Sequence, residues 1–113
     1  QVMMGCYKPE YPLVMKDVQH AKIAAWWDRA VDIIPANGGK GIAIKKVLEH
    51  YHLDPEEAIA FGDGNNDIDM LQSVGTGIAM GNASEQLKAV ADHVCGHVAQ
   101  DGIYHYCLKK GLI

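Results

Sequence analysis

The spacing of apolar and polar residues along the chain changes near Pro35. Beyond this residue, short apolar runs alternate with segments whose apolar positions recur every three to four residues, which is the period of a helix. The sequence therefore predicts strands at 58–61, 77–80 and 93–95, helices at 39–52, 67–74, 84–91 and 101–110, and a short helical turn at 54–57. Strands that alternate with helices indicate a parallel sheet with helices on its faces.

The first 34 residues lack this alternation. Residues 1–7 have the composition of a strand, and the prolines in 8–12 predict a loop. Two short apolar runs then follow, at 23–27 and 31–34. They favour a β-hairpin, although residues 21–30 could also form a helix by propensity.

The end of the first hairpin run carries two tryptophans, Trp26 and Trp27. Successive side chains of a strand point to opposite faces of the sheet. We therefore expect one tryptophan in the core and the other against a neighbour or a substrate cleft.

Composition excludes several classes of function. A chain of 113 residues with 49% apolar side chains can bury the core of one modest domain. Its net charge of −4 and the lack of any Lys/Arg cluster larger than a pair argue against a nucleic-acid surface. No apolar run reaches the ~18 residues of a membrane span, and nothing resembles a signal peptide, so we expect no membrane partner and a cytoplasmic location.

The cysteines and histidines give no sign of a metal or disulfide framework. Cys6, Cys95 and Cys107 are odd in number and lack CxxC spacing, so we expect ordinary reduced thiols. The six histidines show no HxH or HExxH spacing, so we expect them to be surface or half-buried residues.

The most polar stretch follows the predicted strand 58–61 and reads GDGNNDID. Parallel sheets bind ligands at the carboxyl ends of their strands, which is where Asp63, Asn66 and Asp67 would lie. Carboxylate oxygens suit Mg²⁺, and the start of the following helix favours an anion such as phosphate. A simple turn with a capped helix is the alternative, although such a turn needs fewer polar residues.

Two further residues lie at predicted helix starts. Lys40 opposes the helix dipole there, which favours a nearby anion, although a solvated lysine is the common case. Asn82 is expected to cap the helix that begins at Ser84, with Glu85 as its partner.

The stretch GDGNNDIDML at 62–71 resembles the GDGxND-x-x-ML motif of the haloacid dehalogenase superfamily, in particular its Cof-type phosphatases. The sequences VDIIP at 31–35 and GKG at 39–41 are similar to the segment in which chains of this family leave the cap domain and enter the core domain. GIAMGNA at 77–83, VAD at 90–92 and DG at 101–102 then follow in the family's order. One departure is Gly39, which stands where the family usually has a small polar residue.

This resemblance implies an α/β fold: the second half of a Rossmann-like three-layer parallel-sheet core at 35–113, preceded at 1–34 by the last strands of an α+β cap domain. It implies a phosphatase that acts on small phosphorylated metabolites with Mg²⁺ as cofactor.

The resemblance also implies roles for the matching residues. Asp63 would ligate Mg²⁺, and Asp67 would hold a metal-bound water or orient Lys40. Lys40 and Asn66 would bind the phosphate, and Lys40 would stabilise the charge of the transferring phosphoryl group.

The family's nucleophile motif, DxD at the end of a strand, has no counterpart here. The only DxD sequence is Asp67-Ile68-Asp69, inside a predicted helix where the two carboxylates would diverge by about 200°. The chain therefore resembles the C-terminal part of a larger phosphatase. We expect it to be inactive alone and to associate with itself or with an N-terminal portion.

Two other functions stay open. A binding module with a vestigial metal and phosphate site is one. The phosphorylation domain of ion-pumping ATPases is the other, but their GDGxND motif continues differently from the Ile68-Asp69-Met70-Leu71 found here.

Overall fold

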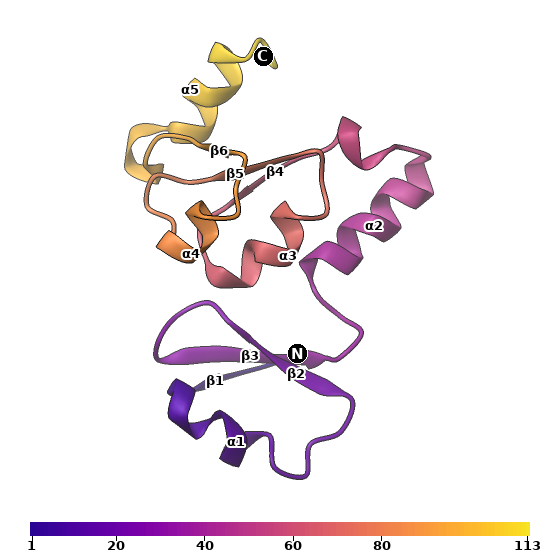
Figure 1. The fold of residues 1–113 in the computed structure, drawn as a ribbon, viewed down its shortest axis with the longest axis vertical. Coiled ribbons are helices and arrows are strands. Elements are labelled where there is room, and N and C mark those ends of the chain that lie inside the picture. Colours follow the sequence, from indigo (N-terminus) through magenta and orange to yellow (C-terminus); the bar gives the residue numbers. More distant parts are fainter.

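The computed structural model describes residues 1–113, which form two three-stranded sheets in succession (Figure 1). The first sheet is antiparallel, in the order β1-β3-β2. Its strands are β1 (Val2–Gly5), β2 (Ala21–Ala25) and β3 (Ala30–Pro35). The hairpin prediction is therefore confirmed over the helical alternative for residues 21–30.

The connection from β1 to β2 is partly helical. A 3₁₀ turn, η1 (Lys8–Glu10), leads into the short helix α1 (Tyr11–Val14). The loop predicted at 8–12 is thus wrong. Pro9 and Pro12 each occupy a first-turn position, where a missing N–H costs no helical hydrogen bond.

The tryptophans do not lie on opposite faces of a strand, contrary to expectation. β2 ends at Ala25, and both residues belong to the turn that joins β2 to β3. Their rings stack with centroids 6.4 Å apart and planes 20° from parallel. Both side chains remain exposed, because a turn has no alternation that would send one of them into the core.

The second sheet is parallel, in the order β4-β5-β6. Its strands are β4 (Ile59–Gly62), β5 (Thr76–Ala79) and β6 (His93–Val94). The helices around it are α2 (Lys40–Tyr51), α3 (Ile68–Leu71), α4 (Glu85–Lys88) and α5 (Gly102–Lys109), with 3₁₀ turns η2 (Pro55–Glu57), η3 (Asn65–Asp67) and η4 (Val98–Gln100). Every predicted element is present, but α3 and α4 are single turns, shorter than the predicted helices.

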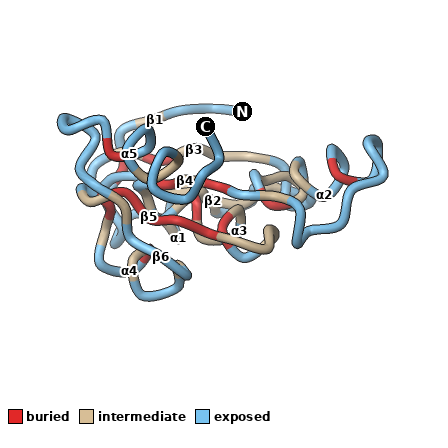
Figure 2. The backbone as a smooth tube through the Cα atoms, turned by 90° about the horizontal axis from the view of Figure 1, so that it is seen from above, coloured by how far each residue is buried: buried red, intermediate tan, exposed pale blue.

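The core of the second sheet lies between its strands and the two short helices. Figure 2 shows buried backbone along β4 and β5, and α3 and α4 pack against these strands. The buried cluster comprises Ala60, Leu71, Ala79, Met80, Ala83 and Leu87. Phe61 makes an edge-on contact with Tyr106 of α5, with centroids 5.6 Å apart.

The molecule is extended for its length. Its radius of gyration is 15.6 Å, whereas a compact domain of this size would have about 13 Å. Only 15 of 113 residues are buried, and the buried apolar cluster belongs to the parallel-sheet part of the chain. The longest helix, α2, has 12 residues, and no helix combines the length and apolarity that a membrane crossing requires.

All three cysteines are free thiols, as expected. Burial raises the pKa of the Cys95 thiol, whose Sγ lies 3.5 Å from Met80 Sδ. The Cys95 side chain also packs against the buried apolar cluster of the parallel-sheet part.

Candidate functional site

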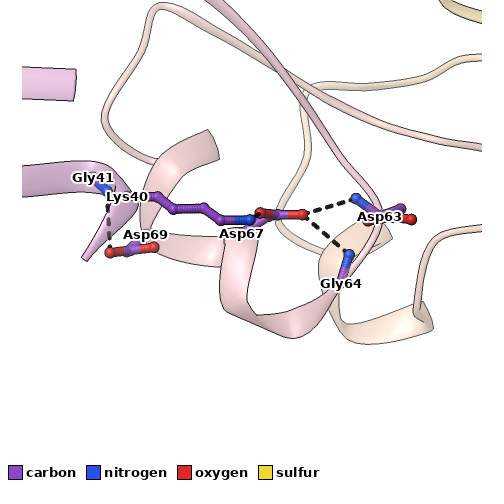
Figure 3. Close-up of polar contacts among 6 residues, drawn as sticks. All are labelled: Lys40, Gly41, Asp63, Gly64, Asp67 and Asp69. Carbon is purple, nitrogen blue, oxygen red and sulfur yellow. Dashed lines mark hydrogen bonds and ion pairs between the residues drawn. The ribbon is translucent and has the colours of Figure 1, made fainter. Parts of the chain in front are cut away.

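The predicted site residues meet where β4 ends. Asp63 follows the last residue of β4, and Asn66 and Asp67 belong to the 3₁₀ turn η3 that comes next. Lys40 is the first residue of α2 and reaches the same place from the side (Figure 3). The carboxyl end of a parallel strand is where open α/β sheets bind ligands.

Asp67 holds this arrangement together. Its side chain is buried, and one carboxylate oxygen, Oδ1, accepts a hydrogen bond from Lys40 Nζ. The other oxygen, Oδ2, accepts hydrogen bonds from the backbone N–H of Asp63 at 3.0 Å and of Gly64 at 3.2 Å (Figure 3). The carboxylate thus fixes both the lysine and the loop after β4, and its charge is satisfied by donors on both sides.

Gly62 makes room for this carboxylate. A Cβ atom at Gly62 would lie 2.7 Å from Asp67 Cβ and 3.0 Å from Asp67 Oδ2. Any larger residue at the end of β4 would push Asp67 out of its position. The glycine before Asp63 is therefore required by packing at this strand end.

Asp69 has a role that the sequence reasoning missed. Its Oδ2 accepts a hydrogen bond from the backbone N–H of Gly41 at 3.2 Å and so caps the start of α2 (Figure 3). The N-cap residue of α2, Gly39, has no side chain to do this and adopts φ 138°, a value that favours glycine. Gly39 is also the residue that departs from the family pattern. Because its N-cap position has no side chain, the sequence indicated that the cap of this helix must come from another residue.

Asp63 and Asn66 face open space beside the lysine. Both line a cavity of about 460 Å³ together with Lys40. The Asp63 side chain is exposed and takes part in no hydrogen bond or ion pair, in contrast to Asp67. The free carboxylate of Asp63, the ammonium group of Lys40 and the amide of Asn66 therefore lie around the same cavity, which Asp32 also lines.

The prediction that Asn82 caps α4 is wrong. Ser84 is the N-cap, and its hydroxyl oxygen accepts from Leu87 N at 3.2 Å. Asn82 Oδ1 instead accepts from Val98 N at 3.0 Å and so ties the loop after β5 to η4. Serine at the helix boundary can bond the third residue of α4, so the cap requires no side chain two residues earlier.

The donor set fits part of a magnesium site. No group of three or more His, Cys, Asp or Glu side chains in the structure is arranged to hold a metal ion. Mg²⁺ usually takes one or two carboxylates and fills its other positions with water and phosphate oxygens. Asp63 can supply one such carboxylate beside the cavity that it shares with Lys40.

Comparison with known proteins identifies the family. A family model described as haloacid dehalogenase-like hydrolase matches residues 9–107. The chain belongs to the haloacid dehalogenase-like hydrolases. The Cof-type resemblance is thereby confirmed, and the chain corresponds to the C-terminal portion of these hydrolases.

Relatives of this chain contain the same region within proteins of different lengths. The uncharacterised protein in the pdhA 5′ region of Geobacillus stearothermophilus is 46% identical over 92 residues, which are 81% of this chain and 97% of that protein. The putative phosphatase YkrA of Bacillus subtilis is 43% identical over 91 residues, which are 80% of this chain but 35% of YkrA.

Solved structures support the same fold. The structure of the subclass IIB sugar phosphatase BT4131 matches with a TM-score of 0.89 and 32% identity. The match covers 98% of this chain and 43% of BT4131. The antiparallel sheet followed by a parallel sheet with helices is therefore the fold of this family's C-terminal portion, as the sequence predicted.

Proposed function

We propose that this chain supplies the phosphate-binding and metal-binding part of a Mg²⁺-dependent phosphatase, which hydrolyses small phosphorylated metabolites through an aspartyl-phosphate. The ion pair of Lys40 and Asp67 at the end of β4, beside the free carboxylate of Asp63, carries this proposal. In this interpretation residues 1–34 are the last strands of the cap domain and residues 35–113 are the second half of the core.

Lys40 is the phosphate ligand in this proposal. Asp67 fixes the position of its ammonium group, while half of the side chain stays exposed to the cavities in front of it. A positive charge that is held in place before the reaction is worth most in the phosphoryl-transfer transition state. The Asn66 amide lines the same cavity and would donate a hydrogen bond to a phosphate oxygen.

Asp63 is the residue that would hold Mg²⁺. When bound, the ion neutralises phosphate charge and aligns the phosphate with the attacking group. Asp67 serves this site indirectly, because its two oxygens already accept hydrogen bonds from Lys40 and from the backbone of Asp63 and Gly64. Asp67 was expected either to hold a metal-bound water or to orient Lys40, and the geometry supports the second role.

Residues 1–113 should show no phosphatase turnover by themselves. The one DxD sequence uses Asp67 to hold Lys40 and Asp69 to cap α2, so neither carboxylate is free to attack phosphorus. We expect no Mg²⁺-dependent hydrolysis of p-nitrophenyl phosphate by the purified chain. Turnover that Asp63→Asn abolishes would contradict this expectation.

The phosphate site can be tested without turnover. Inorganic phosphate is titrated into the ¹⁵N-labelled chain, and the dissociation constant is read from amide chemical shifts. Lys40→Met should weaken binding about tenfold, because it removes a charge-assisted hydrogen bond. Lys45→Met is the matched control, since Lys45 is an exposed lysine of the same helix that lines none of the cavities around Lys40. Equal effects of the two substitutions would refute the site.

A further inference from the structure

Asp32 is a carboxylate without a partner. It lies on β3, the central strand of the antiparallel sheet, between Met3 of β1 and Ala24 of β2. Its Oδ1 atom is shielded from solvent, yet no donor of the chain reaches it, and no ion pair includes it. It is the only buried side-chain oxygen or nitrogen in the structure that lacks a hydrogen-bond partner. Polar atoms that leave water normally acquire such a partner.

The carboxylate lines a cavity between the two sheets. This cavity has a volume of about 630 Å³, which is in the range of small-molecule sites. Lys22, Asp32 and Ile34 of the antiparallel sheet contribute to it, and Lys40 and Asn66 contribute from the parallel-sheet side. In Figure 1 the two sheets lie one above the other, and α3 and the start of α2 face the antiparallel sheet.

Asp32 also borders the proposed phosphate site. It lines the cavity of about 460 Å³ that contains Lys40, Asp63 and Asn66. A phosphate ester bound at Lys40 and Asn66 would thus extend its leaving group into cavities that Asp32 also lines. Asp32 therefore borders the space that the leaving group would occupy.

The chemistry of a carboxylate defines what it can select. An ionised Asp only accepts hydrogen bonds, so it favours hydroxyl groups and repels a second anionic group. We propose that Asp32 is a specificity-determining residue, which accepts a hydrogen bond from a hydroxyl of the leaving group and discriminates against leaving groups that carry a carboxylate. This inference rests on the proposed function, since it places the phosphate at Lys40.

A matched pair of ligands tests the inference. Sorbitol 6-phosphate and 6-phosphogluconate have the same six-carbon chain and differ in a terminal hydroxymethyl or carboxylate group. In amide chemical-shift titrations of residues 1–113 with Mg²⁺ present, the wild-type chain should bind sorbitol 6-phosphate about tenfold more tightly, because the hydroxyl compound gains a hydrogen bond to a charged acceptor. Asp32→Asn should reduce this preference to within about twofold.

The control variant is Asp28→Asn, which removes an exposed carboxylate from the turn next to β3. It should leave the preference unchanged. An unchanged preference in Asp32→Asn would overturn the inference. The inference would also be overturned if neither ester changed the spectrum of the wild-type chain at concentrations at which inorganic phosphate changes it.

Failure of the inference and failure of the proposed function give different results. If Lys40→Met does not weaken inorganic phosphate binding, the phosphate site is wrong, and the inference is wrong with it. If Lys40→Met does weaken phosphate binding while Asp32→Asn leaves the ester preference intact, only the inference is overturned.

Stability gives a test that needs no ligand. A carboxylate retained for substrate recognition contributes little to folding, so Asp32→Asn should keep or raise the Tm measured by circular dichroism. A Tm lower by more than about 5 °C, which corresponds to a structural contribution, would overturn the inference.

Discussion

Asp67 accepts hydrogen bonds from three donors in two separate segments through one carboxylate. It contacts the lysine at the start of α2 and two backbone amides of the loop after β4. A buried charge that loses one of its partners costs more than an exposed one, because the remaining groups are left without hydrogen bonds. The geometry of Lys40 and of the loop therefore depends on this single side chain.

Asp67→Asn should destabilise the chain by about 2–3 kcal/mol, because one end of the carboxamide must present its NH₂ group to a donor. Urea denaturation followed by circular dichroism measures this change. Asp63→Asn is the control and should change the stability by less than about 0.5 kcal/mol, since the Asp63 side chain is exposed and makes no hydrogen bond. Equal losses in the two variants would contradict the assigned role of Asp67.

At the level of elements, α2 and α3 are held against each other by a glycine and an aspartate. Gly41 lies so close to α3 that an added Cβ would be 2.5 Å from the carbonyl oxygen of Asp69 and 2.6 Å from Ser73 Oγ. The same aspartate caps α2 through the N–H of Gly41. This close approach positions Lys40 at the start of α2 beside the loop after β4.

Gly41→Ala should therefore destabilise the chain, although alanine is the better helix former by up to about 1 kcal/mol. Overpacking typically costs 1–3 kcal/mol, so we expect a net loss of about 1–2 kcal/mol in urea denaturation. The amide signals of Asp63 and Gly64 should also shift as Lys40 moves. Gly5→Ala is the control, because its nearest contact would be an ordinary 3.7 Å to Arg29 O. A Gly41→Ala chain as stable as Gly5→Ala would refute the packing argument.

The element pattern and the position of the candidate site residues after β4 were predictable because they depend on local sequence. Apolar periodicity located the strands, and the polar stretch after β4 located Asp63, Asn66 and Asp67. The helix dipole at Lys40 predicted its partner only in kind, as an anion, because the pair joins residues 27 positions apart, and only the family resemblance named Asp67. The role of Asp69 and the proposed role of Asp32 escaped prediction because both depend on which elements pack together, which a local pattern does not encode.

At the level of the whole molecule, the parallel sheet ends in an open edge. β4 pairs with β5 on one side and with no strand on the other, and Ile59 is 42% exposed. Parallel sheets are usually covered on both faces, and an unpaired edge strand tends to pair with another strand. The proposed metal ligand Asp63 follows this edge strand directly. A strand added beside β4 would therefore end close to Asp63 and could bring further carboxylates to it.

Mg²⁺ binding should reveal whether such a complement completes the site. With Asp63 as the one proposed carboxylate ligand, residues 1–113 should bind Mg²⁺ in the millimolar range or more weakly, or with about −4 kcal/mol at best. Addition of the N-terminal portion of YkrA should tighten calorimetric Mg²⁺ binding at least tenfold and produce phosphatase activity at the same time, because two half-sites become one. Asp63→Asn should abolish both gains, whereas Glu85→Gln, an exposed carboxylate on α4, should abolish neither. A stable complex with unchanged Mg²⁺ affinity would exclude Asp63 as a ligand and leave the loop after β4 as a capped turn.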